Sequence, residues 1–273
     1  MATVQENSHE LWVCHLGNVP YRDALAIQGH LRERRQAGAL PDVLLLLEHP
    51  RVYTSGRRSA SGRRSGAQDL PLPEDFYRAK GIEVIATDRG GRLTYHAPGQ
   101  LVGYPIMGID DVGRFLRTME GAIVAALAEE GIAAHSRHDQ GIDYTGVWVG
   151  QRKIASIGLH VSRGVTTHGF AINVDNDLDP FSWVVACGLP DVQMTSLQRE
   201  LAAAQGTQTT PACAPLLACF RRRMAFHFAQ AHSRRQRLVS PWRLGIDTTN
   251  ADRRAQRAPI KTISSTPVEA IPV

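Results

Sequence analysis

Residues 144–174 have the sequence YTGVWVGQRKIASIGLHVSRGVTTHGFAINV, which restricts the fold more than any other part of the chain. Strand-forming residues fill three runs here, at 144–149, 152–161 and 168–174. The two gaps between the runs contain Gly150 and Gly164 and have the composition of turns. The pattern therefore predicts three consecutive strands joined as an antiparallel meander.

The rest of the chain alternates between helical and strand periodicity, which is typical of an α/β domain. We expect strands at 11–16, 43–47, 82–86 and 101–106, and helices at 20–38, 110–131 and 216–228. The stretch from Ser55 to Gly66 is rich in arginine and serine, and it predicts a mobile loop. Apolar periodicity ends near Pro241, so we expect one domain over 1–240 and a disordered tail over 241–273.

The composition limits the class of protein. Of the 273 residues, 43% are hydrophobic, which is enough for one sizeable core. There is neither a signal-peptide pattern nor a run of roughly 18 apolar residues, so we expect a cytoplasmic protein without a membrane partner. The four cysteines show no CxxC spacing, which predicts reduced thiols and no zinc site. The net charge of +5 comes almost wholly from arginine and favours acidic partners.

Residues 89–96, RGGRLTYH, have the composition of a ligand-binding loop. Paired glycines let a backbone approach a ligand, and guanidinium groups beside hydroxyls suit an anionic or carbonyl group. From composition alone, however, a glycine turn with solvated arginines is favoured. His96 is the strongest functional candidate among the histidines because it closes this segment. No two histidines have a metal-binding spacing such as HExxH, so we assign no metal.

Lys153 lies at the start of an expected strand. If that strand is regular, Lys153 shares a face with Ala155 and Ile157, and its ammonium group begins at an apolar surface. Such a lysine is either buried against a specific partner or extends past the strand end into water. The sequence favours neither alternative over the other.

Cys187 follows the apolar run WVVA and precedes Gly188-Leu189-Pro190. A free cysteine is most often a small buried hydrophobic residue, and taken alone this structural role is favoured. The glycine and proline shift the balance, because they place the thiol where a buried run breaks into a loop. Cys14, Cys213 and Cys219 lack such a context, and we expect structural roles for them.

Four longer segments carry a family resemblance. They are RGGRLTYHAPGQLVGYP (89–105), GQRKIASIGLHV (150–161), THGFAINV (167–174) and ACGLPDVQMTSL (186–197). In this order they resemble the signature segments of the octanoyltransferases, the lipoyl(octanoyl) transferases of protein lipoylation. LGNVPYRDALAIQ (16–28) and LLLEHPRVYTSGRR (45–58) resemble the same family, and the resemblance covers about residues 11–232.

This resemblance implies an α/β (α+β) fold shared with biotin and lipoate protein ligases, a mixed β-sheet flanked by helices. It implies that Cys187 is a nucleophile that carries an acyl group as a thioester, and that Lys153 favours its thiolate form. The implied acyl-substrate contacts come from three segments: Arg89, Gly90, Gly91, Arg92, Leu93, Thr94, Tyr95 and His96; Ser156, Ile157 and Gly158; and Gly169, Phe170 and Ala171. Gly169 and Ala171 share one strand parity, and small side chains there leave room for an eight-carbon chain.

The implied reaction moves octanoyl from octanoyl-acyl carrier protein to the ε-amine of a lysine. The implied acceptors are the lipoyl domains of E2 subunits of 2-oxoacid dehydrogenases and the glycine cleavage H protein. Because a thioester lies uphill of an amide, this transfer needs no ATP, no metal and no other cofactor.

Two alternatives remain. An ATP-dependent lipoate or biotin protein ligase on the same fold would keep a lysine at position 153 but form an acyl-adenylate, and the segment around Cys187 argues against it. A non-catalytic nucleic-acid binder is supported only by the positive charge, so we expect no nucleic-acid partner.

Overall fold

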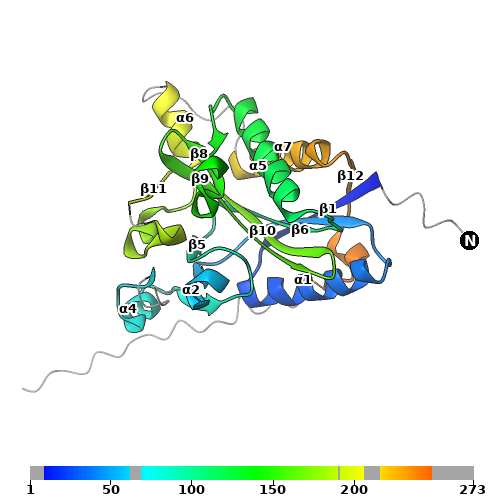
Figure 1. The fold of residues 1–273 in the computed structure, drawn as a ribbon, viewed down its shortest axis with the longest axis horizontal. Helices are drawn as coiled ribbons and strands as arrows, with labels where there is room; N and C mark the ends of the chain where they lie inside the picture. Colours follow the sequence, from blue (N-terminus) through cyan, green and yellow to red (C-terminus); the bar gives the residue numbers. More distant parts are fainter. Residues whose placement is uncertain (1–8, 62–68, 190, 206–215, 248–273) are drawn as a thin grey trace, which may run out of the picture.

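The computed structural model describes residues 9–61, 69–189, 191–205 and 216–247, and its largest feature is a mixed sheet (Figure 1). The strands lie in the order β12-β1-β2-β6-β10-β9-β8-β7, and β11 pairs with β9. Their bounds are β1 (Glu10–Asn18), β2 (Asp42–Glu48), β6 (Gln100–Ile106), β7 (His135–Ser136), β8 (Gly146–Val149), β9 (Arg152–Ser162), β10 (Val165–Asn173), β11 (Gln193–Met194) and β12 (Arg235–Leu238). β8, β9 and β10 pair antiparallel, which confirms the predicted meander.

Helices cover both faces of this sheet (Figure 1). The helix α1 (Tyr21–Gln36) packs on one face, and α5 (Val112–Glu129) and α7 (Leu216–Ala231) pack on the other. Leu44 and Leu46 of β2 enter the core below α5 and α7, whereas Leu45 and Leu47 enter the core beside α1. Because both faces are covered, this strand is apolar throughout rather than alternating.

A smaller sheet, β4-β3-β5, lies beside the main one. It consists of β3 (Val52–Ser55), β4 (Glu83–Ala86) and β5 (Thr94–His96), and the short helices α2 (Arg57–Ser61) and α4 (Glu74–Ala79) accompany it. The helix α2 corrects the expected mobile loop at 55–66. Backbone N–H groups of Gly56 and Arg57 donate to carbonyl oxygens of Arg92 and Arg89, which ties this segment to the RGGR stretch. Residues 62–66 lie outside the described part.

The strand β9 contains a bulge. Lys153 and Ala155 pair with the adjacent residues Trp148 and Val147 of β8, so that Ile154 is an extra residue on β9. A one-residue bulge reverses which side chains face each side of a sheet.

The domain continues past the expected boundary at 240. Pro241–Leu244 form the 3-10 turn η6, the side chain of Leu244 is fully buried, and Nη1 of Arg34 donates to its carbonyl oxygen at 2.6 Å. The expectation of a disordered tail is therefore wrong for 241–247, because this turn covers the α1 side of the core. Residues 248–273 lie outside the described part.

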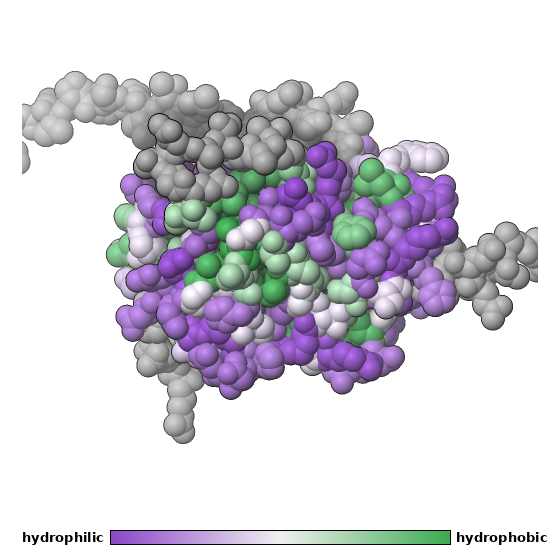
Figure 2. Space-filling model, turned by 90° about the horizontal axis from the view of Figure 1, so that it is seen from above, coloured by the Kyte–Doolittle hydropathy of each residue, from purple (hydrophilic) through white to green (hydrophobic). Residues whose placement is uncertain are grey.

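Two properties concern the molecule as a whole. On the face shown in Figure 2, apolar residues gather in a central area that hydrophilic residues surround. Within the described ranges, no helix is both long and apolar enough to cross a membrane.

Candidate active site

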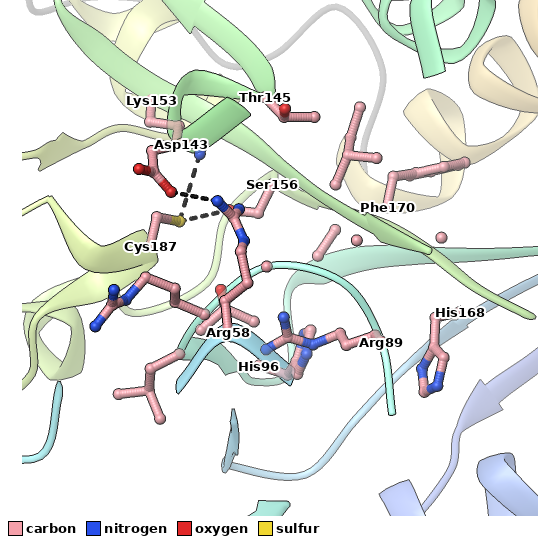
Figure 3. Close-up of a pocket in the computed structure, with 18 of the residues that line it drawn as sticks. Arg58, Arg89, His96, Asp143, Thr145, Lys153, Ser156, His168, Phe170 and Cys187 are labelled. Atoms are coloured by element: carbon pink, nitrogen blue, oxygen red, sulfur yellow. Dashed lines mark hydrogen bonds and ion pairs between the residues drawn. The ribbon is translucent and has the colours of Figure 1, made fainter. Parts of the chain in front are cut away.

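One pocket brings most of the predicted site residues together (Figure 3). At one end, Sγ of Cys187 lies 3.4 Å from Nζ of Lys153 and 3.7 Å from Oγ of Ser156. The pocket encloses about 560 Å³ of empty space, including its open mouth. The amine of a lysine and a hydroxyl therefore converge on one thiol.

Lys153 is buried and does not extend into water. Its exposed fraction is 1%, and Nζ lies 5.1 Å from the centre of the Trp148 ring, where the ring face attracts a cation. The bulge at Ile154 places Lys153 and Ser156 on one side of β9, toward the thiol. The grouping of Lys153 with Ala155 and Ile157 is therefore wrong, because it assumed a regular strand.

Cys187 has a strained backbone. It lies in the turn η5 (Ala186–Gly188) with φ of 58°, in the left-handed region that residues other than glycine rarely occupy. Its N–H donates to the carbonyl oxygen of Leu93 at 2.8 Å. Gly188 follows with φ of 73°, and a Cβ at this position would overlap the side chain of Arg92. The RGGRL stretch thus holds the turn that presents the thiol.

The other described cysteines differ from Cys187, which is free and half-buried. Cys14 is free but fully buried, and burial raises the pKa of its thiol to about 12, as its expected structural role requires. Cys219 is disulfide-bonded. The expectation of reduced thiols is therefore wrong for Cys219.

Arg89 and His96 use their polar atoms within the protein. The Arg89 guanidinium donates to Oγ1 and the carbonyl oxygen of Thr54 and to the carbonyl oxygen of Gly90. His96 contacts Thr54 Oγ1 through Nε2 and Gln100 Oε1 through Nδ1, and burial lowers the pKa of its imidazole well below the usual value. Both side chains line the pocket, and their hydrogen bonds to other residues of the chain hold the pocket wall in place.

All predicted site residues except two line the pocket. The lining ones are Arg89, Gly91, Arg92, Leu93, Thr94, His96, Lys153, Ser156, Ile157, Gly158, Gly169, Phe170, Ala171 and Cys187. Tyr95 instead packs against Phe181 and Tyr53 in the core of the small sheet. Gly90 lies against β9, where its N–H donates to the carbonyl oxygen of Leu159 at 2.7 Å.

The missing side chain of Gly169 does not create the expected room for an acyl chain, although its backbone lines the pocket. A Cβ at this position would overlap the carbonyl oxygen of Gly103 on β6, so the glycine permits close backbone packing instead. The preceding residue, His168, has φ of 56°, an irregularity that strand parity did not predict. The apolar lining comes mainly from Leu93, Ile157, Phe170 and Ala171.

Sequence reasoning missed several lining residues, which are Tyr21, Arg58, Tyr104, Ile142, Asp143, Thr145 and His168. His168 donates from Nε2 to Oδ1 of Asp88 at 2.7 Å, and its Nδ1 faces the Tyr21 hydroxyl at 3.4 Å. This hydrogen bond from His168 lowers the pKa of Asp88 to about 2, whereas burial lowers the pKa of His168 despite its acidic neighbour. The position of His168 beside the GFA segment was the only signal available in the sequence.

The described residues contain no group of three or more His, Cys, Asp and Glu side chains arranged to hold a metal ion. The pocket places a thiol beside the amine of a buried lysine, a pair that can exchange a proton.

Comparison with known proteins identifies relatives. The family described as "Lipoyl protein ligase A/B catalytic domain" matches residues 20–218. A protein of Rubrobacter xylanophilus named octanoyltransferase is 45% identical over 188 residues, which cover 68% of this chain and 81% of the relative. An octanoyltransferase of Mycobacterium marinum is 40% identical over 215 residues, which cover 76% and 86% of the two chains.

Solved structures share the fold. Lipoate-protein ligase A bound with ATP has a TM-score of 0.66 at 18% identity, covering 85% of this chain and 89% of that one. A putative lipoate protein ligase of T. acidophilum with bound lipoic acid has a TM-score of 0.64 at 20% identity and the same coverage. At these identities the likeness concerns the fold alone, and it confirms the expected mixed sheet flanked by helices.

Proposed function

The chain belongs to the lipoyl protein ligase A/B catalytic domain family, and on this premise we propose that it moves octanoyl groups through a thioester on Cys187. It is an acyltransferase of protein lipoylation, like the octanoyltransferases that it resembles over most of its length. The observation that supports Cys187 most strongly is the 3.4 Å separation between its sulfur and Nζ of a buried lysine.

In the first half-reaction, Lys153 takes the proton of the Cys187 thiol. The thiolate attacks the carbonyl carbon of octanoyl-acyl carrier protein, so that a new C–S bond forms and the bond to the carrier sulfur breaks. The leaving thiolate then takes the proton back from Lys153. At an effective dielectric constant near 20, a cation about 4 Å from an anion contributes up to about 4 kcal/mol, which favours the ion pair that starts this step.

In the second half-reaction, the acceptor lysine attacks the Cys187 thioester as a neutral amine. The amide bond forms, the C–S bond to Cys187 breaks, and the proton of the amine passes through Lys153 to the sulfur. The enzyme returns to its starting state without ATP. Leu93, Ile157, Phe170 and Ala171 supply apolar surface for the acyl chain, at about 0.8 kcal/mol for each buried methylene.

The partners that we propose are octanoyl-acyl carrier protein as donor and lipoyl domains, including the glycine cleavage H protein, as acceptors. The positive net charge of the chain supports acidic protein partners. We also propose the cytoplasm as the compartment. The free thiols of Cys14 and Cys187 support a reducing compartment, whereas the disulfide of Cys219 does not.

Intact-mass analysis tests the proposal. After incubation with octanoyl-acyl carrier protein, the chain should gain one octanoyl group, which a lipoyl domain should then remove and carry itself. Cys187→Ala should gain none, whereas Cys14→Ala, which removes the other described free thiol, should still be acylated. An adduct on Cys187→Ala would refute the assignment. Modification of the lipoyl domain by free octanoate and ATP alone would favour the ligase alternative.

A further inference from the structure

We propose that Glu120, a carboxylate of α5 outside the pocket, is a positioning residue for Lys153, an inference that rests on the role proposed above for that lysine. Its exposed fraction is 1%, although it belongs to a helix whose neighbouring buried positions are apolar. Burying a carboxylate is costly, and replacing a buried ion pair by apolar residues often leaves stability unchanged or higher. Fold stability alone therefore gives little reason for a glutamate here.

The carboxylate of Glu120 holds two strands of the sheet. Oε1 accepts from the backbone N–H of Gly146 at 2.9 Å, at the start of β8. Oε2 accepts from the hydroxyl of Ser136 on β7 at 2.8 Å and lies 3.0 Å from Nη1 of Arg117. Glu120 thus fixes the backbone where β7 and β8 meet α5.

The side chain of Lys153 lies against the backbone of Gly146. Its φ is 136°, and a Cβ at this position would lie 2.8 Å from Cε of Lys153. Gly146 also pairs across the sheet with Ser156, the second residue that contacts the Cys187 sulfur. A shift of this backbone segment would therefore move the lysine relative to the thiol.

The hydrogen bond between Glu120 and Ser136 stabilises the strand pair that carries Trp148, the ring beside Nζ of Lys153. In the β7–β8 pair, Ser136 lies opposite Val147 and His135 lies opposite Trp148, whose ring faces the ammonium group. The two hydrogen bonds of Glu120 consequently stabilise both the backbone beside the Lys153 chain and the strand that carries the ring below its Nζ. Glu120 touches neither Lys153 nor Cys187 in any described contact, so it acts through these two strands.

The test compares Cys187 alkylation by iodoacetamide at pH 7 with octanoyl-transfer kinetics. Glu120→Ala should slow alkylation and lower kcat by about tenfold or more with KM little changed, because small displacements of reacting groups cost this much. Glu120→Gln should stay near wild type, since its amide oxygen still accepts from Gly146 and its amide N–H can donate to Ser136.

Met119→Ala is the matched control for destabilisation. Met119 is the preceding residue of α5 and is fully buried, but its side chain lies in the apolar core. It should lower Tm while keeping the alkylation rate within about twofold of wild type, since a cavity there leaves the Glu120 bonds in place. Equal losses in Met119→Ala and Glu120→Ala at matched Tm would overturn the inference, as would wild-type alkylation in Glu120→Ala.

Two further measurements report on the role of Glu120. If Glu120→Ala fails to fold, Ser136→Ala removes only the bond to β7 and should give a smaller but measurable slowing, and no slowing would count against the role. If the wild-type chain takes up no octanoyl group, the proposed function fails, while the alkylation rates still report separately on whether Glu120 positions Lys153.

Discussion

Arg58 and Asp143 form an ion pair, 2.5 Å between Nη1 and Oδ1, that joins two sides of the pocket (Figure 3). Arg58 comes from α2 beside the small sheet, and Asp143 comes from the 3-10 turn η3 (Ile142–Tyr144) ahead of β8. The exposed fractions of the two side chains are 34% and 48%, and pairs this exposed contribute about 0–1 kcal/mol. The ion pair therefore closes this edge of the pocket only weakly, and breaking it costs little free energy.

Asp143→Asn should widen access to Cys187. We expect the ratio of alkylation rates for a bulky maleimide and for iodoacetamide to rise by up to about fivefold, the factor that corresponds to about 1 kcal/mol. Taking a ratio removes any change in the thiolate fraction, which affects both reagents. Asp139→Asn, an exposed neighbour outside the pocket, should leave the ratio unchanged. An equal rise in both variants would mean that the ion pair does not restrict entry.

Lys153→Ala should make the Cys187 thiol less reactive. Loss of the buried cation removes the main stabilisation of the thiolate, so alkylation by iodoacetamide at pH 7 should slow by at least about tenfold. Lys80→Ala, which removes an exposed lysine packed against Phe76 and Trp183, should react like the wild-type chain. An alkylation rate that does not depend on Lys153 would remove this residue from the mechanism.

Leu244→Ala should destabilise the domain although it lies beyond the boundary expected from the sequence. Truncating a fully buried leucine lowers the free energy of unfolding by about 2–4 kcal/mol, which urea denaturation would measure. Trp242→Ala lies in the same turn, but that side chain is 84% exposed, and its effect should stay within about 0.5 kcal/mol. Two equally small effects would show that η6 does not belong to the folded domain.

Asp88→Asn should change how stability depends on pH. The pKa of Asp88 is lowered to about 2 in the folded chain and is about 4 in an unfolded one, so its ionised form favours folding. This contribution is complete above about pH 4 and is lost as the pH falls toward 2. The stability difference between wild type and variant should therefore shrink over that interval in chemical denaturation. A difference that stays constant from pH 6 to pH 2 would contradict the assignment.

Regular elements were predictable because local patterns determine them. The apolar run at 43–47 became β2, and the helix expected at 110–131 became α5, whose first turn is capped by Asp111, which accepts from the N–H of Arg114 at 2.9 Å. The turn-separated runs at 144–174 became the meander. In each case the signal lies within a few residues of the structure that it specifies.

Contacts between distant segments were not predictable in this way. Nothing near Arg89 in the sequence shows that its guanidinium meets Thr54, and nothing near Ser55 shows that the following residues bond to the RGGR stretch. Glu120 belongs to an otherwise apolar helical face, and only tertiary structure brings Gly146 and Ser136 to it. The identities of the pocket residues were largely available, but the hydrogen bonds that decide what each one does were not.

The extra residue at Ile154 makes the pocket depend on an irregularity of the sheet. Lys153 and Ser156 are three positions apart, so a regular strand of the same length would turn them to opposite faces, and only the bulge brings both to the sulfur. Ile154 and Ala155 are fully buried in the apolar core, which leaves the backbone little room to straighten. Core packing far from the thiol therefore preserves the distortion on which the arrangement of the pocket relies.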